Sequence, residues 1–265
     1  MPTSPQALES ANQMTRRFAI YPSLAGRSVV VTGGASGIGA EIVRGFAEQD
    51  ARVGFLDMDG EASAALAAEI GGNAGYELCD LRDIAALRRA LAALRERHGP
   101  AAVLVNNAAR DDRHDWREVT PEYFDDRIAV NLRHYFFAMQ AVAPDMIAAG
   151  GGAIVNMGSN SWWEAGGGFP VYATAKAAVH GLTRTMARDL GPHRIRVNTV
   201  VPGWIMTERQ KALWVTPEAL ERQRRRQCLP DLIEPVHVAR MVVFLASDDA
   251  AMCTANNYMI EAGSI

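Results

Sequence analysis

The sequence has little of what marks a metalloprotein, a disulfide-rich protein or a membrane protein. Its three cysteines, at positions 79, 228 and 253, form no CxxC motif, and its six histidines show no HxH or HExxH pattern. We therefore predict neither a disulfide framework nor a metal site. No apolar run reaches the ~18 to 20 residues of a membrane span, and residues 1–17 lack the apolar core of a signal peptide. A cytoplasmic protein without membrane contact is expected.

An excess of charge of one sign is also missing. The 27 Lys and Arg residues against 30 Asp and Glu residues give a net charge of −3. Without a basic stripe, nucleic acid is not an expected partner. Residues 1–20 are mostly polar and contain two prolines. This composition predicts a flexible N-terminal tail there, followed by one catalytic domain over residues 21–265.

Short β-branched runs alternate with longer alanine-rich, helix-periodic segments from residue 28 onward. This alternation predicts an α/β fold, a single doubly wound domain with a seven-stranded parallel sheet and helices on both faces. The expected strands span residues 29–32, 52–57, 75–79, 102–106, 153–157, 196–201 and 258–260. The expected helices span residues 39–49, 60–70, 84–98, 121–149, 172–190 and 234–246.

A glycine-rich segment, residues 32–39, follows the first expected strand and opens the first helix. Glycines in this context permit a tight turn and let backbone N–H groups approach a pyrophosphate at the helix N-terminus. The order strand, loop, helix is that of a Rossmann dinucleotide site. The candidate cofactor residues here are Gly33, Ser36, Gly37, Ile38 and Gly39.

Asp57 ends the second expected strand, a little under twenty residues after the glycine segment. An acid at this position binds the adenosine ribose hydroxyls and repels a 2′-phosphate, so NAD is the expected cofactor. An ordinary strand-end acid that begins a turn is the alternative. Asp80, beside Leu81 at the end of the third strand, is expected to accept from the adenine amino group.

Tyr172 and Lys176 are four residues apart in a segment that favours a helix, so their side chains share one face. An ammonium close to a phenol favours the phenolate, and we predict that Lys176 lowers the pKa of Tyr172. Tyr172 is then a candidate base. A solvated pair on a helix surface is the alternative.

These motifs, in this order, resemble the short-chain dehydrogenase/reductase family over residues 24–265. Residues 32–39 look like the family's cofactor loop, residues 106–109 (Asn-Asn-Ala-Ala) are similar to its NNAG motif, and Tyr172-x-x-x-Lys176 matches its active-site motif. Ala109 departs from the family, which more often has glycine there. Ser159, thirteen residues before Tyr172, stands where the family's catalytic serine does.

The resemblance implies roles for further residues. Asn131 falls at the position of the family's structural and catalytic asparagine, and residues 202–207 resemble the segment that holds the nicotinamide carboxamide. The implied catalytic residues are Asn131, Ser159, Tyr172 and Lys176. The implied cofactor contacts beyond the adenosine side are Asn107, Ala108, Tyr172, Lys176, Pro202, Gly203, Ile205 and Thr207. A homotetramer, built by the helices over 121–149 and 172–190 and by the last strand, is also implied.

By the same resemblance Ser159 holds the reacting oxygen, and Lys176 hydrogen-bonds the nicotinamide ribose. Asn131 supports a water through which protons reach solvent. Each role has an alternative, since Ser159 could cap the chain after its strand, with Ser161 as a rival hydroxyl, and Asn131 could make only a packing hydrogen bond.

Within the family the likeness is greatest to bacterial NAD-dependent aldose 1-dehydrogenases of the D-xylose, L-arabinose, galactose and fucose types, D-xylose especially. Residues 111–114, 130–134, 161–162, 227–229 and 247–250 carry it. The implied reaction transfers a hydride from C1 of an aldose to NAD and produces the sugar lactone and NADH. Which sugar, which anomer and which physiological direction stay open.

The polar segment over residues 203–230 follows a strand end and is a candidate lid. A sugar needs polar partners for its hydroxyls and an apolar face for its ring. The candidate substrate residues are Ser159, Asn160, Trp162, Glu164, Tyr172 and Arg209. Residues 111–114 could also reach the pocket, and either Trp162 or Trp163 could instead pack at a subunit interface.

Two other functions remain possible at this stage. The fold and catalytic residues also serve dehydrogenases of other secondary alcohols and reductases of 3-oxo compounds. A non-catalytic NAD-binding protein is the third possibility, which the Ser159, Tyr172 and Lys176 set disfavours.

Overall fold

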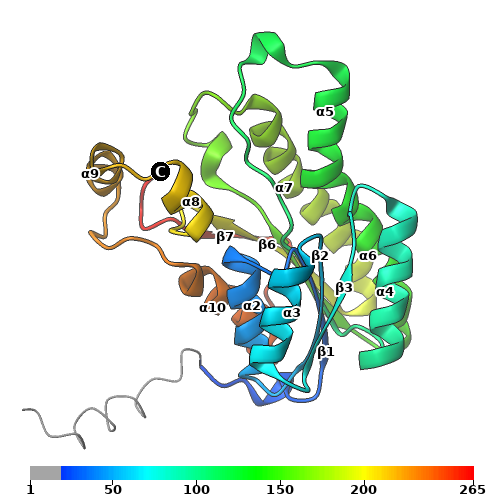
Figure 1. Ribbon diagram of the computed structural model, residues 1–265. Coiled ribbons are helices and arrows are strands. Elements are labelled where there is room, and N and C mark those ends of the chain that lie inside the picture. The colour runs from blue at the N-terminus through cyan, green and yellow to red at the C-terminus, as the bar shows by residue number, and fades with distance from the viewer. Residues whose placement is uncertain (1–18) are drawn as a thin grey trace, which may run out of the picture.

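Seven parallel strands form one sheet in the computed structural model, which describes residues 19–265. The strand order is β3-β2-β1-β4-β5-β6-β7, which confirms the predicted doubly wound α/β fold (Figure 1). The predicted tail lies almost entirely outside the described residues. The strands are β1 (Ser28–Thr32), β2 (Arg52–Asp57), β3 (Ala74–Leu78), β4 (Val103–Asn106), β5 (Gly152–Met157), β6 (Ile195–Pro202) and β7 (Asn257–Ile260).

The central strands read as apolar runs because helices cover both faces of the sheet. β1, with the sequence Ser-Val-Val-Val-Thr, is buried at every position. Its register pairs Thr32 with Leu56 of β2 and with Asn106 of β4, so the three strands end side by side. The direction of winding changes between β1 and β4, and ligands of such sheets bind at the carboxyl ends of the strands there.

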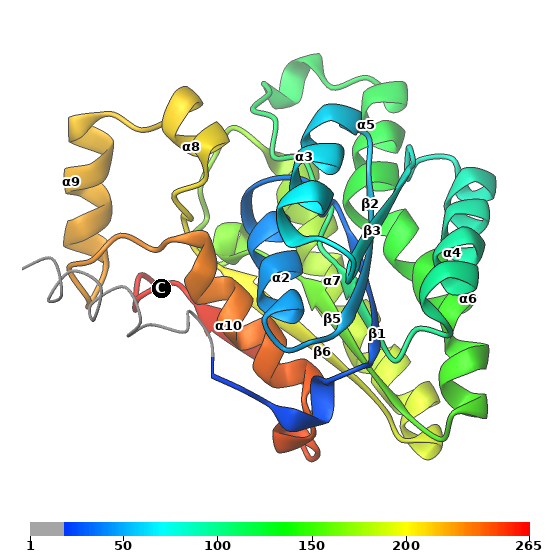
Figure 2. The ribbon, with the colours of Figure 1, turned by 60° about the horizontal axis from the view of Figure 1, so that its bottom comes forward.

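Helices cover both faces of the sheet (Figures 1 and 2). α2 (Gly37–Ala47), α3 (Gly60–Ile70) and α10 (Pro235–Ala246) pack on one face. α4 (Ile84–His98), α6 (His134–Ala148) and α7 (Pro170–Leu190) pack on the other. Each set buries its apolar side chains against the sheet, which gives two cores that hold the strand ends rigidly in place. None of the described helices combines the length and apolar character needed to cross a membrane.

The predicted helix over residues 121–149 is interrupted. α5 (Pro121–Ile128) continues into a π-helical segment, η3 (Ala129–Arg133), before α6 begins. Asn131 within η3 is fully buried, and its Nδ2 atom donates to the carbonyl oxygen of Arg127 at 2.9 Å. Such π segments inside helices often occur at functional sites.

The candidate lid contains two short helices that the sequence analysis did not predict. After β6, the chain forms α8 (Glu208–Leu213) and α9 (Pro217–Arg226). Thr207 and Thr216 cap them by accepting hydrogen bonds from Gln210 N and Ala219 N. α9 lies at the edge of the molecule, and α8 lies between α9 and the rest of the domain (Figures 1 and 2). The remaining short helical turns are η1 (Pro22–Leu24), η2 (Trp116–Glu118), η4 (Asn160–Trp162), η5 (Gly191–His193) and η6 (Asp248–Ala250).

Candidate active site

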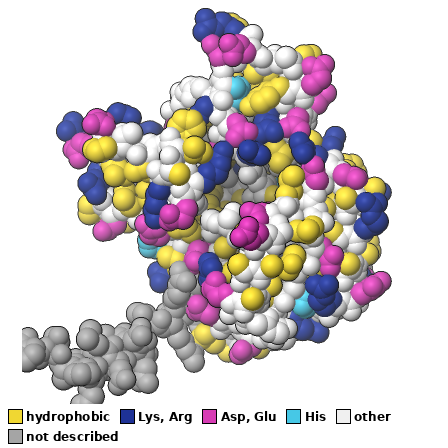
Figure 3. Space-filling view, in the orientation of Figure 1, with side chains coloured by type: hydrophobic (Ala, Val, Ile, Leu, Met, Phe, Trp, Pro, Cys, Tyr) yellow, Lys and Arg dark blue, Asp and Glu magenta, His cyan; other side chains and the backbone are white. Residues whose placement is uncertain are grey.

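A cavity of about 600 Å³ opens at the carboxyl ends of β4, β5 and β6. The loops after β4 and β5 and the start of α7 form one side of it, and the segment after β6, which contains α8 and α9, forms the other. Acidic and basic side chains gather around the hollow in the space-filling view (Figure 3). Its size and partial enclosure suit a small molecule together with part of a cofactor.

The glycine segment at the start of α2 has the geometry of a phosphate cradle. Gly33 and Gly37 have φ angles of +66° and +55°, which residues other than glycine rarely adopt. A Cβ atom on Gly39 would lie 1.8 Å from the carbonyl oxygen of Gly33, so only glycine fits. Ser36 makes no side-chain cap for α2, which leaves its first N–H groups without that partner. This arrangement fits a dinucleotide pyrophosphate.

Asn107 and Ala108 hold the glycine segment against β1. The Nδ2 atom of Asn107 donates to the carbonyl oxygens of Thr32 and Gly33, at 3.0 and 2.8 Å. The backbone N–H groups of Asn107 and Ala108 donate to the Thr32 hydroxyl. Asn107 also lines the cavity, so it combines a structural role with a position in the candidate site.

Asp57 connects the end of β2 to the glycine segment. Its Oδ2 atom accepts from Ala35 N at 2.9 Å, and its Oδ1 atom accepts from Met58 N and Asp59 N. A carboxylate has about four acceptor sites, so room for a ribose hydroxyl is left. The side chain is partly exposed, as the predicted role requires.

Asp80 is more heavily occupied than the sequence suggested. Arg82 binds both of its carboxylate oxygens, with Nη2 at 2.7 Å from Oδ2 and Nε at 2.9 Å from Oδ1. The hydrogen bond from Arg82 lowers the pKa of Asp80. Leu81 beside it is buried. Arg82 and Asp80 together form a charged pair where the adenine contact was expected.

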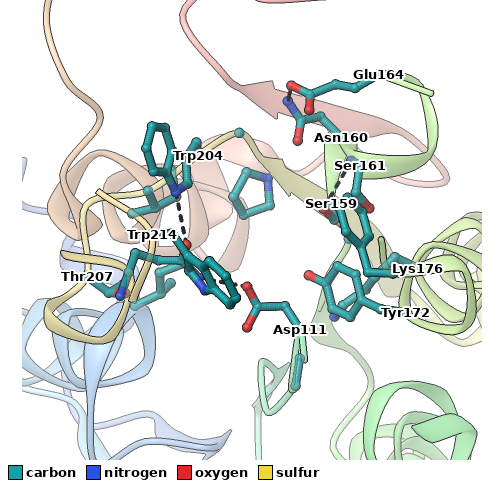
Figure 4. Close-up of a pocket in the computed structure, with 18 of the residues that line it drawn as sticks. Asp111, Ser159, Asn160, Ser161, Glu164, Tyr172, Lys176, Trp204, Thr207 and Trp214 are labelled. Carbon is teal, nitrogen blue, oxygen red and sulfur yellow. Dashed lines mark hydrogen bonds between the residues drawn. The ribbon is translucent and has the colours of Figure 1, made fainter. Parts of the chain in front are cut away.

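Ser159 and Tyr172 meet in the cavity (Figure 4). Ser159 follows β5, and its Oγ atom accepts from Ser161 N at 3.1 Å, so it caps the short turn η4 as well as facing Tyr172. Burial raises the pKa of Tyr172 to about 12, and the carboxylate of Asp111 adds to this, while the hydrogen bond with Ser159 and the charge of Arg113 lower it. The predicted lowering of the Tyr172 pKa is therefore wrong for the protein without cofactor.

The burial of Lys176 explains why this residue does not lower the pKa of Tyr172 as predicted. Its Nζ atom donates to the Tyr135 hydroxyl at 3.0 Å and to the carbonyl oxygen of Met157 at 2.8 Å. The side chain is 1% exposed, and burial lowers the pKa of Lys176 to about 7, although Asp111 raises it. Since burial penalises the charge on both groups, spacing on the helix alone does not activate the phenol.

Asn131 is not among the described residues that line the cavity. Its Oδ1 atom accepts from Arg110 N at 2.8 Å, and its Nδ2 atom donates to the carbonyl oxygens of Arg110 and Arg127. These bonds fix the loop after β4 onto η3. Both hydrogens of the Asn131 amide are used in these bonds. A relay water could therefore hydrogen-bond to Asn131 only through the second lone pair of Oδ1.

The segment to which the resemblance assigns the nicotinamide contact, residues 202–207, contributes to the wall of the cavity. Pro202, Gly203, Ile205 and Thr207 all face it. Gly203 N donates to the carbonyl oxygen of Ile260, and a Cβ atom on Gly37 would meet the Thr207 methyl group at 3.3 Å. The segment thus lies against the glycine segment at the start of α2.

Of the predicted substrate residues, Asn160 and Glu164 line the cavity, and Asn160 Nδ2 donates to Glu164 Oε1 at 2.7 Å (Figure 4). Trp162 and Arg209 are not among the described residues that line the cavity. Trp162 stacks on Trp163 at 3.7 Å between ring centroids and donates to His180 Nε2 at 3.1 Å. This packing turns its indole toward α7.

Arg209 binds acids of the loop after β4 instead. Its guanidinium contacts Asp111 Oδ1 at 2.5 Å and Asp112 Oδ1 at 3.0 Å. Gln210 donates to the other oxygen of Asp111 at 2.7 Å. α8 is therefore fastened across the cavity mouth, as a closed lid would be.

Several cavity residues were not assigned by the sequence analysis. Trp204 and Trp214 lie across the cavity from Ser159 and Tyr172 (Figure 4). Asp111, in the 111–114 segment that the sequence analysis allowed to reach the pocket, projects between the two sides (Figure 4). α9 adds side chains at helical spacing, which is the one signal that could have revealed them. These residues are Ala219, Arg222, Gln223 and Arg226. The described residues contain no cluster of three or more His, Cys, Asp or Glu side chains that could hold a metal ion.

Comparisons with known proteins cover nearly the whole chain. Residues 33–264 match the family model described as enoyl-(acyl carrier protein) reductase. The chain is 50% identical over 248 residues to the D-xylose 1-dehydrogenase of Caulobacter vibrioides, covering 92% of this chain and 98% of that protein. It is 45% identical over 254 residues to the "Probable galactose dehydrogenase" of Rhizobium meliloti, covering 94% and 99%.

A solved structure agrees with this. The structure of a short-chain type dehydrogenase/reductase from Mycobacterium ulcerans matches with a TM-score of 0.87 at 27% identity. The match covers 91% of this chain and 90% of that one.

Proposed function

Because the chain belongs to the short-chain dehydrogenase/reductase family, we propose that it is an NAD-dependent aldose 1-dehydrogenase. Its substrate is an aldose of the D-xylose or galactose kind, and its product is the sugar lactone. The observation that carries this proposal is the meeting of Ser159 and Tyr172 in a cavity whose other walls are polar and aromatic. The identity to sugar dehydrogenases over almost the whole chain supports the same substrate class.

The bound cofactor supplies the hydride acceptor and, in its oxidised form, a positive charge. Ser159 orients the C1 hydroxyl group of the sugar, and Tyr172 accepts its proton as the C1 hydrogen leaves as hydride. The pKa of Tyr172, about 12 without cofactor, must fall for this step. A positive charge close to the phenol acts in that direction. Lys176 donates to Tyr135 and Met157 and, when protonated, keeps a further hydrogen for the nicotinamide ribose, the role that the resemblance implies.

We infer NAD rather than NADP from the position of Asp57. Its carboxylate is partly exposed at the end of β2, beside the glycine segment. A negative charge here accepts hydrogen bonds from ribose hydroxyls and repels a 2′-phosphate. The glycine segment itself contains no Arg or Lys to bind such a phosphate.

The cavity favours a sugar over an acyl chain. The family model's description names an enoyl reductase, but charged side chains line much of this cavity. They include Asp111, Arg113, Glu164, Arg222 and Arg226. An acyl chain would desolvate these charged groups without adding hydrogen-bond partners, whereas sugar hydroxyls can hydrogen-bond to them.

Turnover tests the proposal directly. Purified protein is incubated with NAD or NADP and a panel of pentoses, hexoses and simple alcohols, and reduction of the cofactor is followed. We expect turnover of aldoses with NAD, and loss of turnover with retained NAD binding in Tyr172→Phe. Turnover restricted to non-sugar alcohols would overturn the substrate class, and tight NAD binding without any turnover would indicate a non-catalytic protein.

Two further proposals concern the whole molecule. Residues 203–230 act as a lid, supported by the contacts of Arg209 and Gln210 across the cavity mouth. The chain assembles as a cytoplasmic homotetramer through α5, α6 and α7 and the C-terminal strand. Exposed Phe124, Phe136 and Ile147 on α5 and α6 support such an interface. Light scattering on the purified protein measures the assembly directly.

A further inference from the structure

Gln223 is the buried residue of α9, a helix whose other residues are exposed or partly exposed. It lies on α9 and is 6% exposed, whereas Arg222, Arg224, Arg225 and Arg226 around it are exposed. Its Nε2 atom is buried and has no hydrogen-bond partner. The side chain lines the cavity. α9 thus brings a residue with an unpaired amide group to the wall of the cavity.

Ser161 has the same property on the opposite wall. It is 7% exposed, lines the cavity, and its Oγ atom has no partner. Its backbone N–H donates to the Oγ atom of Ser159, which keeps Ser161 beside the catalytic serine. The two residues belong to segments that are some sixty positions apart in the sequence.

Few buried polar side chains without a partner line the cavity. Among the described residues, seven side chains have a buried polar atom without a partner, and Ser161 and Gln223 are the two of them that line the cavity. A buried polar group without a partner is normally costly, so its presence at a site needs an explanation. A ligand that supplies the missing partner is such an explanation.

Neighbouring polar groups of the cavity are already paired within the protein. Asn160 donates to Glu164, which also contacts Arg226 Nη2 at 3.3 Å. Gln210 donates to Asp111. A polyol brings several hydroxyl groups that each donate and accept. A carboxamide can pair with a hydroxyl through either of its ends, and a serine hydroxyl can do the same.

We propose that Ser161 and Gln223 bind hydroxyl groups of the aldose other than the one that is oxidised, and so determine which sugar is accepted. This assignment rests on the proposed function and names the residues that select the substrate. Gln223 contributes from the lid, so the selection is completed when α9 covers the cavity.

The test uses the full-length variants Gln223→Leu and Ser161→Ala with NAD. For the best aldose we expect kcat/KM to fall about 10- to 100-fold, mainly through a higher KM, because a hydroxyl loses its partner. A series of monodeoxy aldoses identifies that hydroxyl. With the wild-type enzyme, the deoxy sugar that lacks this hydroxyl should have a lower kcat/KM than the parent sugar. For that deoxy sugar, the variant and the wild type should have the same kcat/KM.

Gln227→Leu is the matched control, the same change one helical turn further on. The Gln227 carboxamide donates to the carbonyl oxygens of Leu229 and Asp231 and does not line the cavity. We expect Gln227→Leu to keep the wild-type ratio between normal and deoxy sugars. Gln223→Leu should have an unchanged or higher Tm without ligand, because it removes an unpaired buried amide. A structural role for Gln223 would instead lower the Tm.

Two results would overturn the assignment. Variants with wild-type kcat/KM and wild-type discrimination against deoxy sugars would show that the two side chains do not bind the sugar. A lower Tm combined with equal losses on every substrate would assign them to structure. Failure of the proposed function is visible separately, since the wild-type enzyme would then turn over no aldose, which would also end this assignment.

Discussion

The Nε2 atom of His114 accepts a hydrogen bond from the backbone N–H of Val171 at 3.3 Å, one residue before Tyr172. The backbone N–H of His114 donates to the carbonyl oxygen of Gly168 at 2.8 Å. Phe169, at the N-cap position of α7, makes no side-chain cap. The loop after β4 therefore caps the helix that carries Tyr172 and Lys176, and the Nδ1 atom of His114 must carry the proton.

His114→Ala should reduce kcat about 10-fold while NAD affinity stays close to the wild-type value, because loss of the cap loosens the first turn of α7. The free energy of unfolding should fall by about 1 kcal/mol, as for other lost caps. Steady-state kinetics and urea denaturation measure the two effects. Tyr123→Phe is the control, since it removes only the hydroxyl 3.0 Å from Nδ1. Wild-type kcat in His114→Ala would contradict a positioning role.

Asp57→Asn should reduce the ratio of kcat/KM with NAD to that with NADP by about 10- to 100-fold, because the repulsion of a 2′-phosphate disappears and a ribose acceptor is weakened. The Tm should also fall, since the Oδ2 acceptor for Ala35 N is replaced. Asp59→Ser is the charge-matched control, because it keeps an N-cap for α3. An unchanged cofactor ratio in Asp57→Asn would assign discrimination to another residue.

The pKa of Lys176 gives stability a defined pH dependence in the absence of cofactor. Burial lowers it to about 7, against 10.5 for an exposed lysine. Between these values the unfolded chain binds a proton that the folded chain lacks, so stability rises with pH from about 7 toward 10. Tyr172, with its pKa raised to about 12, acts in the opposite sense above pH 10.

Urea denaturation at several pH values from 7 to 9.5 measures this contribution. Lys176→Met should lose the rise in stability that the wild type shows over this range. Lys211→Met, which removes an exposed lysine paired with Glu208, should keep it. Parallel curves for the wild type and Lys176→Met would mean that Lys176 stays charged in the folded protein.

Arg209→Met should raise KM for every aldose by a similar factor, because the lid loses its ion pairs with Asp111 and Asp112. The wild-type KM should rise with salt concentration toward that of the variant, since these pairs are partly exposed and screened. Lys211→Met on the same helix is again the control. A loss confined to sugars with one particular hydroxyl would instead restore Arg209 as a substrate-binding residue.

Much of the fold could be predicted because it rests on local patterns. β2 has the predicted bounds, the other strand boundaries differ by one residue, and α3 and α4 begin and end as expected. The break at Asn131 was missed because the helical pattern continues through it, and only the burial of its amide against Arg110 reveals the need for a π segment. α8 and α9 were missed because their faces meet the cavity rather than a core.

By itself the sequence determined the order of strands and helices, the glycine cradle, and the placement of Tyr172 and Lys176 on one helical face. The tertiary structure alone decided that burial raises the Tyr172 pKa, that Arg209 binds acids nearly a hundred residues away, and that Gln223 is an unpaired amide in the cavity. Spacing determines which side chains are neighbours on one element. Desolvation and pairing depend on distant segments that meet only when the chain folds.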